Sequence, residues 1–253
     1  MMTDKDELLL KKRISELASL CYQRDVTLYT DFLTLNEQTI FHSLRREIPS
    51  VSCKLTGGYE TAERKIVCFL SSYEDENTVS PISILKAGPA DLRFASPLTH
   101  RDYLGALMNL GIERGMLGDI LMNETGCYIF CLSKMADYIA RELTRVGHTP
   151  VNCHIVTNPD LQIIPKYEDV SGSVASERLD NLVALAFKTS RSKAVPYIEG
   201  EKVFIDGKMV SSHGASLKGG EIVSVRGLGK FLYVGIENRT KKGRLYVTVK
   251  KYS

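Results

Sequence analysis

The sequence predicts a protein of the mixed α+β class, and three observations support this prediction. Residues 81–156 alternate in the order strand, helix, strand, strand, helix, strand, which is a split βαβ layout. Residues after 176 have the pattern of two short helices followed by short strands with glycine turns. That last third is also strongly basic, whereas the rest of the chain is acidic. The length suffices for more than one domain.

The first 75 residues are expected to form a helical and mixed segment. Apolar side chains recur at helical spacing in residues 4–23 and again in residues 36–46. A glycine-containing turn at residues 57–59 then precedes an apolar strand at residues 65–70. We therefore assign residues 1–75 to an N-terminal segment that precedes the split βαβ region.

Residues 76–165 are assigned to the split βαβ domain. Thr99, with Asp102 three positions later, is a capping box that opens a helix at residues 103–110, and Ser133 is expected to cap a second helix at residues 134–146. This order is that of a ferredoxin-like domain, and the RNA-recognition-motif (RRM) fold shares it. The predicted strands are residues 82–85, 119–122, 127–132 and 151–156.

One strand of this domain leaves two interpretations open. Gly126 to Phe130 resembles the aromatic signature of the RRM, and Tyr128 and Phe130 share one face of the strand. However, no basic residue precedes Gly126, and the first predicted strand has no aromatic side chain. The two rings either stack on RNA bases or belong to ordinary packing.

A linker is predicted within residues 157–175, because this stretch contains Pro159, Pro165 and the sequence Ser171-Gly172-Ser173. The C-terminal domain is placed at residues 170–253. Its first helix is expected after Ser176, a possible cap, since apolar residues follow at helical offsets up to residue 186. Residues 188–193 break this helix and open a second one, which Gly200 ends.

The remainder of the domain is predicted to be strands. Residues 202–205 and 208–210 flank Asp206-Gly207, which is typical of a tight primed hairpin turn. Further strands are expected at residues 222–226, 230–236 and 244–250. In the last of these, Arg244, Tyr246, Thr248 and Lys250 share one face. That face suits a sugar-phosphate backbone, and it also suits an edge strand protected by lysines.

The charge distribution points to a polyanionic partner. Residues 176–253 contain 15 Lys and Arg against 7 Asp and Glu, a net charge of +8, whereas residues 1–175 carry −5. Each cation placed at a phosphate releases condensed counterions, so such a concentration of charge favours nucleic-acid binding. The alternative is a solvated basic face that has no partner.

Four segments of the basic region resemble the S-4 type RNA-binding domain, which is named after a small-subunit ribosomal protein. They are residues 178–180, 190–194, 203–207 and 217–226, and the resemblance covers roughly residues 174–230. It implies a small C-terminal domain of the S-4 type (the αL motif) that binds RNA. Pro196 departs from the family, which usually has an aliphatic residue there. A proline inside a helix removes a hydrogen bond and costs about 3 kcal/mol.

The phosphate contacts can be assigned to residue types. Arg191 and Lys193 stand at a predicted helix N-terminus, where free backbone N–H groups favour an anion. Such contacts recognise the backbone and shape of an RNA and not its bases. We therefore expect a strong preference for folded RNA and a weak preference for base sequence. Changing both residues to glutamate is expected to abolish RNA binding without unfolding the protein. The predicted RNA-binding residues are Arg178, Lys188, Ser190, Arg191, Ser192, Lys193, Arg226, Lys230, Lys241, Lys242 and Arg244.

A second resemblance extends over nearly the whole chain. Residues 31–38, 57–64, 98–120 and 240–244 are similar to the bacterial YlmH family. The resemblance implies an RRM-like domain joined to an S-4 type domain. It also implies a ribosome-associated role, with the large subunit, its rRNA and tRNA as partners in the rescue of stalled translation. Some family members have been described as cell-division or photosystem-associated proteins.

Several classes of function are not expected. No apolar run approaches the ~18 residues of a membrane span, and the N-terminus is polar, so neither a membrane partner nor a signal peptide is indicated. The six cysteines form no C-x-x-C pair, which favours reduced thiols in the cytoplasm and disfavours a zinc site. We expect a monomer without metal, cofactor or small-molecule substrate.

Enzymes that carry an S-4 type module form the competing class. A pseudouridine synthase needs a catalytic domain with its own aspartate motif, a methyltransferase a glycine-rich turn, and a tyrosyl-tRNA synthetase its ATP-binding signatures. None of these patterns is found, so no catalytic residue is assigned and a non-enzymatic RNA-binding protein is predicted. Two alternatives are an accessory of RNA modification and a protein-interaction adaptor, associated with cell division, whose docking face lies at residues 100–119.

Overall fold

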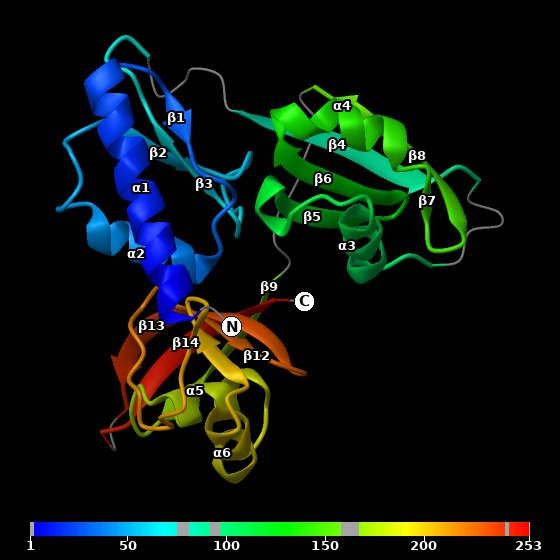
Figure 1. Cartoon of the computed structure of the whole chain (residues 1–253). Coiled ribbons are helices and arrows are strands. Elements are labelled where there is room, and N and C mark those ends of the chain that lie inside the picture. Colours follow the sequence, from blue (N-terminus) through cyan, green and yellow to red (C-terminus); the bar gives the residue numbers. More distant parts are fainter. Residues whose placement is uncertain (1–2, 75–80, 92–96, 158–166, 241–242, 253) are drawn as a thin grey trace. The chain divides into compact units, whose positions relative to one another are not determined.

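The computed structural model describes residues 3–74, 81–91, 97–157, 167–240 and 243–252. The chain divides into two compact units, Met1–Gln162 and Ile163–Ser253, which are described separately below. Their elements are labelled in Figure 1. Within the described residues, no helix is both long and apolar enough to cross a membrane.

The first unit begins with two helices and a small antiparallel sheet. Capping boxes start both helices, with Thr3 and Asp6 at the first and Thr34 and Glu37 at the second. The sheet has the strand order β1-β3-β2. The predicted helices and the strand at residues 65–70 are confirmed. The elements are α1 (Asp4–Arg24), β1 (Leu28–Tyr29), α2 (Leu35–Leu44), β2 (Cys53–Thr56) and β3 (Ile66–Phe69).

Strand β3 is buried on both of its faces. Val67 and Phe69 pack against α1 and α2 in one cluster of apolar residues. Ile66, on the opposite face, packs in a second cluster with Phe32 and with Leu132 of the following domain. The N-terminal segment is therefore joined to the split βαβ region through a shared core.

The split βαβ region forms the predicted antiparallel sheet, in the order β5-β6-β4-β8-β7. Helices α3 and α4 pack on one face of this sheet, as Figure 1 shows. The expected ferredoxin-like layout is confirmed. Its elements are β4 (Ile82–Pro89), α3 (His100–Asn109), the 3₁₀ helix η2 (Arg114–Met116), β5 (Leu117–Asn123), β6 (Gly126–Leu132), α4 (Ser133–Glu142), β7 (Arg145–Val146) and β8 (Thr149–Val156).

The end of α4 differs from the prediction. The helix stops at Glu142, and Arg145–Val146 pairs with the start of β8 as strand β7, so the predicted helix at residues 134–146 is too long. Gly147 has a φ of 58° in the turn between these strands and does not cap the helix. Ser133 is not the cap either, because its hydroxyl bonds the hydroxyl of Ser83.

The second unit contains two helices and one antiparallel sheet of six strands, in the order β11-β10-β12-β13-β14-β9. The helices cover one face of the sheet and share its apolar core. Figure 1 shows them against this sheet. The elements are β9 (Tyr167–Val174), α5 (Leu179–Ala186), α6 (Arg191–Glu199), β10 (Val203–Ile205), β11 (Lys208–Met209), β12 (Ile222–Val225), β13 (Gly229–Arg239) and β14 (Leu245–Tyr252).

Strand β9 corrects two predictions. It lies within the predicted linker at residues 157–175, yet it pairs with the whole of β14 in antiparallel register. The linker is therefore shorter than predicted, and the second unit starts before residue 170. Because β14 lies between β13 and β9, it is an interior strand, and the interpretation of it as a lysine-protected edge strand is wrong.

Local sequence signals in this unit predicted one turn correctly and one helix start incorrectly. In the hairpin of β10 and β11, Asp206 and Gly207 have φ angles of 46° and 77°, as the predicted primed turn requires. Arg178 occupies the N-cap of α5, so the predicted cap at Ser176 is wrong; Ser176 instead accepts two hydrogen bonds from Asn181. Helix α6 starts at Arg191 and includes the exposed Pro196.

Candidate nucleic-acid interface

The centre of the candidate interface is a buried carboxylate held by two predicted RNA-binding arginines. Asp180 lies in the first turn of α5 with a side chain that is only 1% exposed. Arg191 of α6 donates to its Oδ2 atom from Nε at 3.2 Å and from NH2 at 2.6 Å. Arg178 donates to the two carboxylate oxygens at 3.3 Å each. We call these three residues the arginine–aspartate cluster.

The cluster keeps Asp180 charged inside an apolar helix. Burial raises the pKa of this carboxyl group, but hydrogen bonds from Arg191 and Arg178 outweigh burial, so its pKa lies below the ordinary 3.8. The arginines remain 55% and 39% exposed, respectively, and therefore keep donors available to solvent or to a phosphate. The ion pairs thus fix two guanidinium groups without removing them from the surface.

The stability of the protein should depend on the ionisation of Asp180 in acid. Because its folded-state pKa is lowered, the ionised carboxylate stabilises the fold at pH values above its unfolded pKa of 3.8. This stabilisation disappears as the pH falls through the lowered pKa. We therefore expect a fall in pH from about 5 to about 3 to lower the stability of the wild-type chain more than that of an Asp180→Asn variant. Thermal unfolding of both proteins across this pH range measures the difference. Parallel losses in the two proteins would contradict this role.

The N-terminus of α6 provides a separate anion-binding feature. Ser190 is the N-cap, but its hydroxyl bonds the hydroxyl of Ser192 and caps no backbone group. Among the described residues, the N–H groups of Arg191 and Ser192 have no acceptor. Lys193 is exposed one position further along. Two free N–H groups, an arginine and a lysine at one helix start form the arrangement that binds phosphate oxygens.

Other predicted contacts are engaged elsewhere. Lys188 bonds Glu168 of β9 at 2.6 Å, and Lys251 contributes a weaker second pair to that glutamate. Arg244 donates to the carbonyl oxygen of Ser173 at 2.9 Å, at the far end of β9. The expectation that Lys188 widens the contact at the helices is therefore weakened, because its charge is already paired.

Two further residues lie on the opposite face of the sheet. The Arg226 guanidinium lies 4.9 Å from the centroid of Phe204, and the Lys230 ammonium lies 4.6 Å from that of Tyr252. We expected these two residues to extend the phosphate contact at the helices. Their place on the opposite face of the sheet speaks against that expectation. Lys241 and Lys242, also predicted contacts, lie outside the described residues.

The arginine–aspartate cluster changes the interpretation of charge reversal at Arg191. A glutamate there would place a second carboxylate beside the buried Asp180, so we now expect that variant to be destabilised as well as deficient in RNA binding. The sequence pattern indicated Arg178 and Arg191 as RNA contacts but did not reveal that they share an ion partner. An aspartate inside an eight-residue helix that is otherwise almost wholly apolar was the available signal.

In the first unit, the aromatic pair of β6 does not form an open stacking surface. Phe130 is completely buried, and its ring lies 5.0 Å from that of Tyr59. Gly58 is also close, because a Cβ atom at that position would lie 2.7 Å from the Phe130 ring. Plain packing is therefore correct for Phe130, and the alternative of base stacking is wrong.

The segment that covers Phe130 is held by Asp119. This carboxylate accepts hydrogen bonds from the Tyr59 hydroxyl at 2.7 Å and from the backbone N–H groups of Glu63 and Arg64 at 2.7 and 3.2 Å. Arg64 in turn donates to the carbonyl oxygen of Phe32 at 2.7 Å. Three of the segments that resemble the YlmH family, distant in sequence, therefore meet at one point.

A cavity of about 360 Å³ beside this point is lined by Arg64 and Arg114. The hydrogen bonds of both guanidinium groups go to main-chain carbonyl oxygens, including that of Leu117, which accepts from each of them. Burial, with the neighbouring Arg64 charge, lowers the pKa of Arg114 to about 10. Arg64 thus ties the loop before β5 to the N-terminal segment, while Arg114 bonds carbonyl groups at the start of β5 itself.

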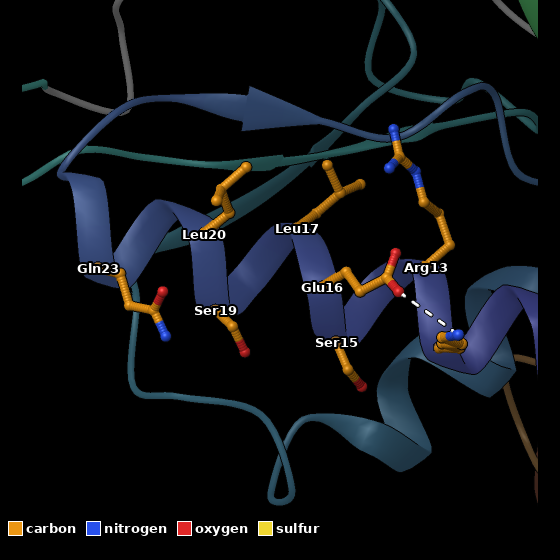
Figure 2. A pocket seen from close by; sticks show the side chains of 8 residues that line it. Arg13, Ser15, Glu16, Leu17, Ser19, Leu20 and Gln23 are labelled. Carbon is orange, nitrogen blue, oxygen red and sulfur yellow. Dashed lines mark ion pairs between the residues drawn. The ribbon is translucent and has the colours of Figure 1, made fainter.

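A second cavity, along α1, does not bring functional side chains together from different elements. Figure 2 shows Leu17 and Leu20 pointing to one side of the helix, while Ser15 and Ser19 point to the other. All of its lining residues belong to this single helix. Within the described part of the chain, no group of three or more His, Cys, Asp or Glu side chains could hold a metal ion.

Comparisons with known proteins agree with this architecture. The family model described as "Putative RNA-binding domain in YlmH" matches residues 90–159. The chain is 31% identical over 224 residues to the Ribosome-associated protein quality control protein P2 of Bacillus subtilis (strain 168), with 88% of this chain and 86% of the relative covered. The solved structure of the Cell division protein ylmH from Streptococcus pneumoniae matches with a TM-score of 0.50 and 21% identity, covering 62% of this chain and 94% of that one. The identity and coverage of the Bacillus relative establish that this chain belongs to the bacterial YlmH family.

Proposed function

We propose that this protein binds RNA at the ribosome, in the cytoplasm, and takes part in quality control of stalled translation. Its partners in this proposal are folded rRNA of the large subunit and tRNA. The role is one of binding and not of catalysis. The observation that carries the proposal is the start of α6, where two free backbone N–H groups, Arg191 and Lys193 are presented together.

Three further observations support it. The second unit has the two helices and the antiparallel sheet that the resemblance to the S-4 type RNA-binding domain implies. Residues 176–253 carry a net charge of +8, as expected for a domain that neutralises phosphates. The Bacillus relative is named for ribosome-associated quality control.

Removal of the positive charges at the start of α6 should weaken binding to purified large ribosomal subunits. We choose Arg191→Gln with Lys193→Gln, because glutamine adds no negative charge beside Asp180. Each lost phosphate contact should flatten the plot of log affinity against log salt by about 0.7 to 0.9, so the slope should change by roughly 1.5 for the pair. Binding of the full chain across a salt series measures this slope.

The matched control is Lys208→Gln with Lys218→Gln, two exposed lysines of the same unit. It lowers the net charge by the same amount away from α6. Equal slopes in the two double variants would contradict the site assignment. Crosslinking in the native cells, followed by RNA sequencing, then tests the biological role. Reads at one large-subunit rRNA site and in tRNA support it, scattered mRNA reads indicate a general RNA-binding protein, and background reads favour the protein adaptor.

A further inference from the structure

The face of the C-terminal sheet opposite α5 and α6 carries a transverse row of side chains. Strand register places Phe204 of β10 beside Ser224 of β12, and Ser224 beside Lys230 of β13. The Lys230 ammonium lies over Tyr252 of β14, and Tyr252 is paired with Tyr167 of β9. We call these five residues the aromatic row. It crosses five of the six strands.

The alternation of side chains along each strand fixes the face of the row. Val203, Val225 and Phe231, each adjacent in sequence to a member of the row, are fully or almost fully buried in the core beneath the helices. The row therefore points to the other face. All five of its members keep intermediate exposure. Five strands at a spacing of about 4.8 Å give the row a length of about 19 Å, which is enough for several nucleotides.

Cations accompany every ring in the row. Arg226 lies over Phe204 at 4.9 Å, Lys230 over Tyr252 at 4.6 Å, and Lys250 over Tyr167 at 5.7 Å. The Tyr167 and Tyr252 rings meet edge to face, with centroids 4.9 Å apart. Two acidic residues share this face, Asp169, which is paired with Lys250 in the register, and Glu237, which accepts a hydrogen bond from Thr248. Against them stand the three cations that lie over the rings, so positive charge remains in excess.

We propose that the aromatic row is a second RNA-contact surface, which takes unpaired nucleotides by stacking. This inference rests on the RNA-binding function proposed above and adds a class of RNA to it. Paired bases hide their faces, so aromatic rings with neighbouring cations select single-stranded segments. The start of α6, in contrast, offers only phosphate contacts. The protein would then recognise a folded element together with an adjoining unpaired stretch.

Two synthetic RNA designs test the proposal with the full chain. One is a plain hairpin, and the other adds a single-stranded extension of about six adenosines at the 5′ or 3′ end, with 2-aminopurine at one position. Stacking on two rings should make an extended RNA bind about tenfold tighter or more than the hairpin. The fluorescence of 2-aminopurine should fall on binding, a signal that a purely structural role of the tyrosines would not produce.

The variant Tyr167→Leu with Tyr252→Leu should lose this gain and the fluorescence change, while its affinity for the plain hairpin stays the same. Tyr246→Leu is the matched control, because Tyr246 lies on the same face of β14, six residues and about 20 Å from Tyr252. If thermal denaturation shows that the double variant does not fold, the single substitution Lys250→Gln tests the same surface.

The outcomes separate this inference from the proposed function. Hairpin binding without any gain from either extension would overturn the aromatic row and leave the proposed function standing. Absence of binding to every one of these RNAs would overturn both. An equal loss of the gain in the Tyr246→Leu control would also overturn the row, since the effect would then not depend on its rings.

Discussion

Replacement of Asp180 by alanine should lower the stability of the C-terminal unit by about 3 kcal/mol, because a buried charge pair loses one partner. The substitution leaves the guanidinium groups of Arg178 and Arg191 facing one another without a counterion. It also removes one of the two acceptors of the Asn181 N–H group, which then donates only to the Arg178 carbonyl oxygen. Both arginines reach solvent, which places the cost at the lower end of the range for buried pairs.

Hydrogen exchange of the full chain measures this effect without the assumption of a single unfolding transition. Backbone amides of α5 and α6, such as those of Leu182 and Ala194, should exchange about 100-fold faster, since ~1.4 kcal/mol is a factor of ten. Asp180→Asn, which removes the charge and keeps the shape, should cause a smaller change.

The control is Asp169→Asn, an exposed acidic residue on β9 of the same unit. Its protection pattern should stay close to that of the wild type, because surface substitutions seldom change stability by more than ~0.5 kcal/mol. If Asp180→Ala and Asp169→Asn were indistinguishable, the arginine–aspartate cluster would have no role in holding α5 and α6 together.

Elements with local signals could be predicted from the sequence. The Thr99–Asp102 capping box opens α3, and Asp206-Gly207 forms the turn of the β10–β11 hairpin. The order of elements in residues 81–156 was sufficient for the split βαβ sheet. In each case, the contacts that determine the element join residues a few positions apart, or the spacing of apolar residues along the sequence indicates the element directly.

Strand β9 could not be predicted, because the strand with which it pairs is distant in sequence. Ser171, Gly172 and Ser173 have low strand propensity, and their composition is that of a linker. They form a strand because β14, more than 70 residues later, supplies their hydrogen-bond partners, and because Ser171 bonds Thr248 across the pair. Tertiary pairing outweighs local preference here.

The candidate site shows the same division between local and distant information. The charge and the order of residues 188–193 predicted the start of α6, where a phosphate is expected to bind. The partner of Arg191 is eleven positions earlier, on another helix. The aromatic row depends on the register of five strands, which no sequence period specifies.

The second large effect is expected for Asp119→Ala in the first unit. This substitution removes the acceptor for three hydrogen bonds, from the Tyr59 hydroxyl and from the N–H groups of Glu63 and Arg64. Loss of a charged acceptor costs about 1.5–3 kcal/mol for such bonds, so we expect a loss of roughly 3 kcal/mol in stability. Amides of residues 57–64 should lose hydrogen-exchange protection first.

Tyr59→Phe provides a graded comparison, since it removes only one of the three bonds, and Asp137→Ala on the exposed side of α4 serves as the control. Protection of residues 57–64 should fall in the order Asp137→Ala, Tyr59→Phe, Asp119→Ala, with the last most affected. Unchanged protection in Asp119→Ala would show that core packing alone holds this segment over Phe130.

RNA affinity of the Asp119→Ala protein distinguishes the roles of the two units. The substitution loosens the cover of the Phe130 ring, whereas the start of α6 and the aromatic row belong to the second unit. If RNA contacts are confined to that unit, the affinity for a plain hairpin and the gain from an extension should both equal those of the wild type. A changed affinity for either RNA would instead mean that the first unit also contributes to RNA binding, through a surface that depends on the hydrogen bonds of Asp119.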